Sequence, residues 1–155
     1  MAEYSANANQ LVNPGETVIV TEAPEPCRRG FVRHRDGTGS FLLSGWVPRF
    51  QNGCNCRNRS AKYNIDFGAN ISVPTGETVG PISLAITIDG ATIPSTQMIV
   101  TPAAVDEYFN VSRASGISVW NGCCETIAIR NTSPIPINVQ NANIIFSRPD
   151  INVTY

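Results

Sequence analysis

The residues with the most distinctive chemistry in this 155-residue chain are five cysteines. Four of them form two close pairs and one stands alone: Cys54 with Cys56, Cys123 with Cys124, and Cys27. A structural zinc ion usually takes cysteine ligands two to four residues apart, because that spacing lets two thiolates converge on one tetrahedral ion. Neither pair has that spacing, so we expect no metal site.

Disulfides between loops are the expected use of these cysteines if the protein works outside the cell. Adjacent side chains on a strand point to opposite faces, so Cys123 and Cys124 should reach different partners. If one partner lies in a neighbouring subunit, the interchain bond would staple an assembly. The alternative is that the cysteines are buried free thiols in a cytosolic protein. The sequence leaves the pairing open.

Positive charge is concentrated in one stretch of a chain whose net charge is −1. Eight of the eleven Lys and Arg residues lie between Cys27 and Lys62, where Asp36 is the one acid. Arginine predominates, which favours bidentate contacts with carboxylates or phosphates. The predicted assembly or docking residues are Arg28, Arg29, Arg33, Arg35, Arg49, Arg57 and Arg59.

The expected partner of these arginines is an acidic protein lattice or an anionic glycan. The alternative is a set of solvated strand faces without a partner. Nucleic acid is not expected, because a dedicated nucleic-acid binder is usually basic overall.

Catalytic motifs do not emerge from the sequence. His34 is the only histidine, and no G-x-S-x-G motif marks a serine nucleophile. Asp106 and Glu107 are adjacent, so on a strand their carboxylates would face opposite sides, which does not suit shared acid–base catalysis. No phosphate-binding, dinucleotide-binding or EF-hand motif occurs. We therefore expect a protein that is not an enzyme and uses no cofactor.

Strands must position these residues. Apolar and polar residues alternate from Ile82 to Ile88, and Asp89-Gly90 is a hairpin signal before a return arm that ends at Val100. Further short apolar segments are separated by Gly, Pro and Asn, and none keeps a helical period. About ten short antiparallel strands at this spacing predict an all-β, single-domain jelly-roll β-sandwich.

Individual segments have specific expectations. Strands are predicted over 16–21 and over 63–73, the latter with a bulge at Gly68, and a hairpin is predicted with arms 31–35 and 40–46. Two pairs of separate strands are predicted further along, at 107–113 and 116–120 and at 137–139 and 143–148. Within a domain spanning 1–155, residues 1–12 are expected as an N-terminal arm and 149–155 as a C-terminal tail strand.

Two segments resemble a known family: VGPISLAITIDG at 79–90 and NTSPIPINVQNANIIFSR at 131–148. They are similar to the C-terminal domain of collagen-like spore-surface glycoproteins and to structural proteins of phages and prophages of Gram-positive bacteria. These proteins are tumour-necrosis-factor and complement-like jelly rolls, which assemble as tight trimers. The resemblance covers residues 63–148 and implies a homotrimer. The chain lacks a collagen-like Gly-X-Y region, which favours a phage structural subunit over a spore glycoprotein.

Such a trimer would need an apolar axis, for which the aromatic candidates are Tyr63, Phe67, Tyr108, Phe109 and Phe146. The alternative is that these side chains fill the core of the monomer. The first expectation is therefore a non-enzymatic, homotrimeric phage virion component, such as a head decoration, a head fibre or a tail-associated protein. Its partners would be other copies of itself and a capsid or spore-surface lattice.

Two other functions stay open. A subunit of an extracellular or spore-associated filament, held by disulfides, would donate 1–12 or 150–155 to an edge strand of the next copy. A carbohydrate-binding module would use Trp46 and Trp120 as stacking platforms, unless both are packed. The sequence shows no secretory signal and no membrane span, so we expect no membrane partner. The protein would reach a virion, extracellular or spore surface by cell lysis.

Overall fold

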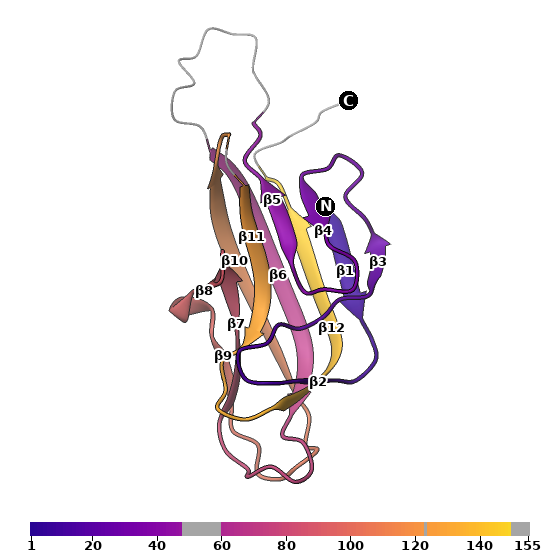
Figure 1. Ribbon diagram of the computed structural model, residues 1–155, viewed down its shortest axis with the longest axis vertical. Coiled ribbons are helices and arrows are strands. Elements are labelled where there is room, and N and C mark those ends of the chain that lie inside the picture. The colour runs from indigo at the N-terminus through magenta and orange to yellow at the C-terminus, as the bar shows by residue number, and fades with distance from the viewer. Residues whose placement is uncertain (48–59, 123, 150–155) are drawn as a thin grey trace, which may run out of the picture.

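A computed structural model describes residues 1–47, 60–122 and 124–149, which form a sandwich of two antiparallel sheets (Figure 1). The strands of sheet A are β1 (Ala2–Ala6), β2 (Gln10–Val12), β3 (Glu22–Glu25), β6 (Ser60–Ser72), β10 (Phe109–Trp120) and β12 (Ile137–Ser147). The strands of sheet B are β4 (Val32–His34), β5 (Phe41–Ser44), β7 (Ile82–Ile88), β8 (Ala91–Thr92), β9 (Met98–Val100) and β11 (Cys124–Asn131). A short 3-10 helix, η1 (Pro94–Thr96), precedes β9. The predicted all-β jelly roll is confirmed.

Each sheet has a defined strand order. Sheet A runs β10-β6-β12-β1-β3, with β2 also paired to β12. Sheet B runs β4-β5-β11-β7-β8, with β9 also paired to β7. One side edge of the sandwich therefore carries β9 and β10, and the other carries β3 and β4 (Figure 1). No helix among the described residues is long and apolar enough to cross a membrane.

The two longest strands of sheet A, β6 and β10, are longer than the sequence predicted. In β6, every odd-numbered residue from Ala61 to Ile71 is buried, the period of a strand with one face toward a core. It pairs with β10 in one unbroken register, from Phe109 opposite Ile71 to Trp120 opposite Ser60. The prediction of two separate strands over 107–120 was wrong, because exposed residues in the middle of β10 interrupt its apolar pattern but not its hydrogen bonding.

A bulge lies in β12 rather than at Gly68, where it was predicted. Gly68 pairs in register with Ser112, whereas the register of β12 against β6 shifts between Gln140 and Asn143. Asn141 adopts a positive φ of 51° there. The extra residue shifts the strand's alternation by one position, so the apolar residues on both sides of the bulge face the core: Ile137, Val139, Ala142, Ile144 and Phe146. The two strands predicted over 137–148 are therefore one bulged strand.

The hairpin predictions in sheet B are confirmed. Asp89 and Gly90 both have positive φ, 47° and 84°, as a type I′ turn requires. The return arm pairs with β7 twice, first as β8 and then as β9. The predicted hairpin over 31–46 forms as β4 and β5.

The strand predicted over 16–21 does not form. Thr17 makes a single bridge to Arg130 of β11. The Val18 N–H then donates to the Ile129 carbonyl, but the Val20 N–H donates to the Thr38 carbonyl in the β4–β5 turn, so no ladder continues. A Cβ at Gly39 would lie 2.1 Å from the Val18 carbonyl oxygen, so this backbone approach requires glycine.

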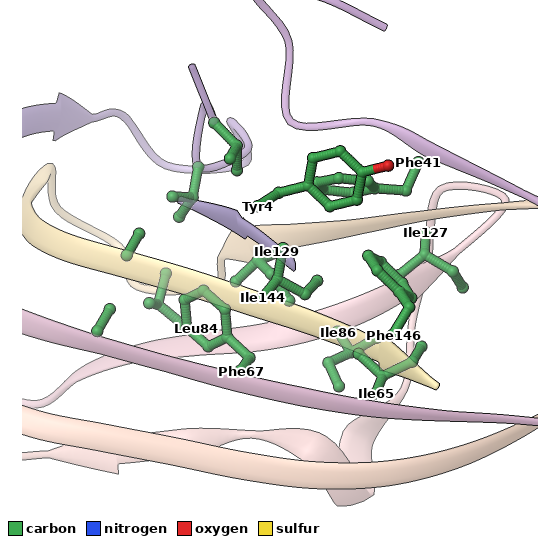
Figure 2. Close-up of a cluster of buried hydrophobic side chains, with 14 of the residues drawn as sticks. Tyr4, Phe41, Ile65, Phe67, Leu84, Ile86, Ile127, Ile129, Ile144 and Phe146 are labelled. Carbon is green, nitrogen blue, oxygen red and sulfur yellow. The ribbon is translucent and has the colours of Figure 1, made fainter. Parts of the chain in front are cut away.

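Both sheets contribute to an apolar core, in which side chains from β6, β7, β11 and β12 meet (Figure 2). Toward β4 and β5 the core becomes aromatic: the ring centroid of Phe41 lies 5.0 Å from that of Tyr4 and 4.9 Å from that of Phe146. Residues 1–12, expected to form an arm, are built into sheet A as β1 and β2. Residues 150–155 of the expected tail strand lie outside the described residues.

Candidate functional site

A cleft of about 450 Å³ opens at the end of the sandwich where β1 and β4 begin and β12 ends. Its base is formed by Tyr63 and Phe146, both 1 % exposed. The walls come from the start of β1, the end of β3 with the β3–β4 loop, and the start of β4. The antiparallel pairing of Ala2 with Phe146 brings these distant segments together.

Three arginines line this cleft, which we call the arginine cleft. Arg28 and Arg29 come from the β3–β4 loop, and Arg148 follows β12. Glu25, at the end of β3, is the one acidic residue among the described residues of the lining. Arg28 and Arg29 were predicted from the sequence, but Arg148 was not, because it lies far along the chain from the basic stretch. The strand predicted over 143–148 ends at this residue, but the strand pattern does not indicate what its end would reach.

Arg148 is held in place by aromatic rings and a carbonyl oxygen. Its guanidinium carbon lies 4.8 Å from the ring centroid of Phe31 and 4.9 Å from that of Tyr63. Its Nη1 donates to the Trp46 carbonyl at 3.1 Å and lies 3.5 Å from the Tyr63 hydroxyl. Contacts between a cation and ring faces stabilise the guanidinium in one orientation. Arg148 is therefore a positioned charge.

Tyr63 fixes the base of the cleft. Its hydroxyl oxygen lies 2.6 Å from the Ser44 carbonyl oxygen and 3.1 Å from that of Phe31. Burial raises the pKa of this phenol above its ordinary value, and the nearby positive charge of Arg148 opposes the increase. The phenol is therefore neutral at physiological pH and serves as a hydrogen-bond donor to the backbone.

Among the other predicted arginines, the two that the structure describes do not line the cleft. Arg33 and Arg35 are exposed on the β4–β5 hairpin. Arg49, Arg57 and Arg59 lie outside the described residues.

The cysteines are not brought together within the described part of the chain. Cys27 lines the arginine cleft and carries a free thiol. Cys124 is exposed at the start of β11. Cys54, Cys56 and Cys123 lie outside the described residues, so the predicted disulfides, including any interchain bond, stay a prediction.

The five aromatic axis candidates divide into two groups. Tyr63, Phe67 and Phe146 are buried between the sheets, so the alternative was right for them: they fill the monomer core and cannot line an axis. Tyr108 and Phe109 are exposed, at the end of the β9–β10 loop and the start of β10. These two remain available for contact with another copy.

Exposed apolar side chains lie on β9, in the β9–β10 loop and at the start of β10. We call them the β9–β10 patch: Ile99, Val105, Tyr108 and Phe109. Ile99, in the middle of β9, is 60 % exposed. Exposed apolar side chains beside the edge of a sandwich are candidates for contact with another copy. β10 also runs beside η1, where Arg113 and the Ser95 carbonyl oxygen are in contact.

The outward face of sheet A is nearly free of charge along its three longest strands. Only Lys62 and Asp66 are ionisable among the outward positions of β6, β10 and β12. The rest are mostly small or amide residues: Asn64, Gly68, Asn70, Ser112, Ala114, Gly116, Ser118, Asn138, Gln140, Asn143 and Ser147. Depletion of charged residues is typical of subunit interfaces.

Both tryptophans are exposed rather than packed. Trp46 is 52 % exposed and stacks on Phe31, with centroids 5.8 Å apart and ring planes at 20°. Trp120, at the end of β10, is 60 % exposed. The alternative that both tryptophans are packed is therefore wrong for this chain.

The single histidine is part of the packing at the cleft-bearing edge. The His34 ring stacks on Phe41 with centroids 4.8 Å apart, and its Nε2 lies 2.9 Å from the Thr38 carbonyl oxygen. The Asp36 carboxylate is 3.9 Å from Nδ1. These contacts orient the ring toward the core and the β4–β5 turn.

Two solved structures share this architecture across nearly their whole length. The globular domain of a zebrafish complement 1qA protein aligns with a TM-score of 0.65 at 11% identity, covering 96% of this chain and 95% of that one. The tumour necrosis factor Eiger of S. frugiperda aligns with a TM-score of 0.63 at 11% identity, covering 99% and 96%. The chain has the tumour-necrosis-factor and complement jelly-roll fold. No protein-family model matches the sequence, and no curated protein sequence matches it.

Proposed function

We propose that this chain is a non-enzymatic structural protein that assembles as a closed homotrimer. In each copy, the β9–β10 patch packs across the outward face of sheet A in the next copy. Such a contact joins two different surfaces, and it closes into a ring when the rotation between copies is one third of a turn.

The observation that carries the proposal is the exposure of the β9–β10 patch beside a sheet face with little charge. Full burial of an exposed Ile or Phe side chain is worth about 1.5–3 kcal/mol. Ile99 is 60 % and Phe109 37 % exposed, so covering each would gain the corresponding part of that free energy. The outward face of sheet A carries few charges, so another copy can cover it without burying many unpaired ionised groups. The fold and the resemblance over residues 63–148 support a trimer as the closed state.

Within this class we propose a phage virion component: a head decoration, a head fibre or a tail-associated protein. The support is the sequence resemblance of 79–90 and 131–148 to phage structural proteins. The filament alternative loses one of its two donor segments, because β1 already lies between β12 and β3 in its own sheet. Donating residues 1–12 would break three strand pairings: β1 with β12, β1 with β3, and β2 with β12. The other segment, 150–155, lies outside the described residues.

Sedimentation velocity over a wide range of protein concentration tests the assembly. A closed trimer sediments as one species of three times 16.7 kDa at every concentration, and negative-stain images show three-lobed particles. Polymers that grow with concentration, or monomers throughout, would contradict it. Antibody labelling of released phage particles tests the virion role, which fails if the label stays on unassembled protein.

A further inference from the structure

We propose that the arginine cleft binds a carboxylate-bearing sugar, a hexuronic-acid unit of an acidic polysaccharide. This activity goes beyond trimer assembly. The cleft lies at the β3–β4 side of the sandwich, away from the β9–β10 patch (Figure 1). Its volume of about 450 Å³ is within the usual range of small-ligand pockets.

The charge of the lining selects an anion. Arg28, Arg29 and Arg148 line the cleft, and Glu25 is the one acidic residue among the described residues of its lining. Guanidinium groups match the planar geometry of a carboxylate, with two parallel N–H donors for its two oxygens. Arg148 is also held by Phe31, Tyr63 and the Trp46 carbonyl. Its guanidinium is therefore already oriented before a ligand binds, which lowers the entropy cost of binding.

The aromatic residues select a ring with an apolar face. Phe31 lines the cleft and stacks on Trp46, whose indole is about half exposed. An amphipathic ring of this kind suits a partner that is apolar on one face and hydrated on the other. A pyranose has such a C–H face, and a uronic acid adds the carboxylate for the arginines.

Glu25 limits the charge density of the ligand. A second anionic group beside the first would lie near this carboxylate and be repelled. The cleft therefore favours one carboxylate per sugar over a densely sulfated chain. Single-stranded nucleic acid also combines phosphate with stacking rings, but its binders usually provide a positively charged groove along the backbone. This chain has a net charge of −1, and the acidic β3 strand, with Glu22 and Glu25, borders the cleft.

Calorimetric titration with tri-galacturonic acid tests the proposal, with the matching neutral galactose trisaccharide as the control ligand. We expect binding of the acidic trisaccharide and at least about tenfold weaker binding of the neutral one, since hydrogen bonds to charged groups contribute on this scale. Equal binding of both sugars, no binding of either, or tighter binding of single-stranded DNA or a sulfated polysaccharide would each overturn the proposal.

Paired variants locate the site. Arg28→Gln with Arg29→Gln should weaken binding of the acidic trisaccharide at least about tenfold. Arg33→Gln with Arg35→Gln removes the same charge from the neighbouring hairpin outside the cleft, and should leave affinity within about twofold. Trp46→Ala should weaken binding about threefold to tenfold, whereas Trp120→Ala should not. The reverse pattern in either pair would overturn the site.

Sedimentation of the same variants separates this proposal from the assembly. Arg28→Gln with Arg29→Gln should keep the mass of the wild type while losing the sugar. If the wild type proves monomeric but binds the acidic trisaccharide, only the proposed assembly fails. If it is a trimer that binds no sugar, only the cleft proposal fails.

Discussion

The two side edges of this sandwich differ in chemistry although they close the same core. The β9–β10 edge exposes Ile99, Tyr108 and Phe109, beside a sheet face with few charges. The β3–β4 edge carries charged residues of both signs, including Glu22, Glu25, Arg28, Arg29 and Arg33. An apolar edge is stabilised when another copy covers it, whereas a charged edge is stabilised by water or by an ion of opposite sign. In the proposals made above, self-association uses the first edge and ligand recognition the second.

The edges also differ in what holds them. The β3–β4 edge rests on an aromatic cluster, in which Phe41 contacts Tyr4, His34 and Phe146. The β9–β10 edge rests on a buried hydroxyl: the Ile86 N–H donates to Thr96 Oγ1 at 2.9 Å, and this oxygen lies 2.8 Å from the Ile93 carbonyl oxygen. Substitutions in the aromatic cluster and at Thr96 test whether each edge depends on these contacts for its stability.

The largest effect is expected beneath the β3–β4 edge. Phe146→Ala removes a fully buried ring that also forms the base of the arginine cleft, and should lower the free energy of unfolding by about 3–5 kcal/mol. Chemical denaturation measures it. The control Trp120→Ala removes an exposed ring and should change stability by less than about 0.5 kcal/mol. A loss below about 1 kcal/mol for Phe146→Ala would show that the ring does not support this edge.

A smaller loss is expected at the opposite edge. Thr96→Val keeps the side-chain shape but leaves the Ile86 N–H without its acceptor, so the free energy of unfolding should fall by about 2 kcal/mol. Hydrogen exchange should also become faster in β9, the strand that follows η1. Ser95→Ala, at an exposed neighbouring position, is the matched control and should have little effect. If exchange in β9 is unchanged, Thr96 does not hold this edge.

Tyr63→Phe tests the base of the cleft without changing its shape. Loss of the hydroxyl removes the contact with the Ser44 carbonyl and one neighbour of Arg148, and should lower the free energy of unfolding by about 1 kcal/mol. Thermal unfolding measures the change. Tyr108→Phe, on the exposed β9–β10 patch, should be neutral. Equal effects of the two substitutions would remove this distinction between the edges.

The smallest effect concerns Glu125 in β11. Partial burial raises the pKa of its carboxyl above the ordinary value, and the nearby Asp89 carboxylate adds to the increase. The folded state therefore binds the proton more tightly than the unfolded state, and stability falls as pH rises through the interval between the two pKa values.

Glu125→Gln removes this penalty and should stabilise the protein at neutral pH by less than about 1 kcal/mol. The gain should vanish below the ordinary pKa of glutamate, where both states are protonated in the wild type. Denaturation of both proteins at a series of pH values measures it. A gain that persists in acid would mean that charge is not its cause.

The sequence predicted elements whose rules are local and missed those set by distant partners. The Asp89-Gly90 turn was predictable because a type I′ turn needs two residues that tolerate positive φ. The bulge at Asn141 was not, because a shift of alternation within one strand resembles the start of a new strand. The segment 16–21 has an alternating pattern, but its backbone hydrogen bonds change partner from Ile129 at Val18 to Thr38 at Val20. No strand forms, because no single neighbouring strand pairs with the whole segment.

The candidate site was predictable to a similar extent. Arg28 and Arg29 were identified by composition, whereas Arg148 reaches the same cleft only because β12 pairs antiparallel to β1. The aromatic axis candidates show the limit most clearly. Tyr63 and Tyr108 are equivalent as residue types, and burial alone separates the base of a cleft from an exposed contact surface.

Sedimentation equilibrium of two charge-altered variants tests the separation of the edges most directly. Ile99→Asp with Phe109→Asp places charge in the β9–β10 patch, and Arg28→Gln with Arg29→Gln removes charge from the opposite edge. We predict a folded monomer of 16.7 kDa for the first variant and a trimer for the second. A trimer that survives the two aspartates, or one that falls apart when the arginines are replaced, would contradict the assignment of assembly to the β9–β10 edge.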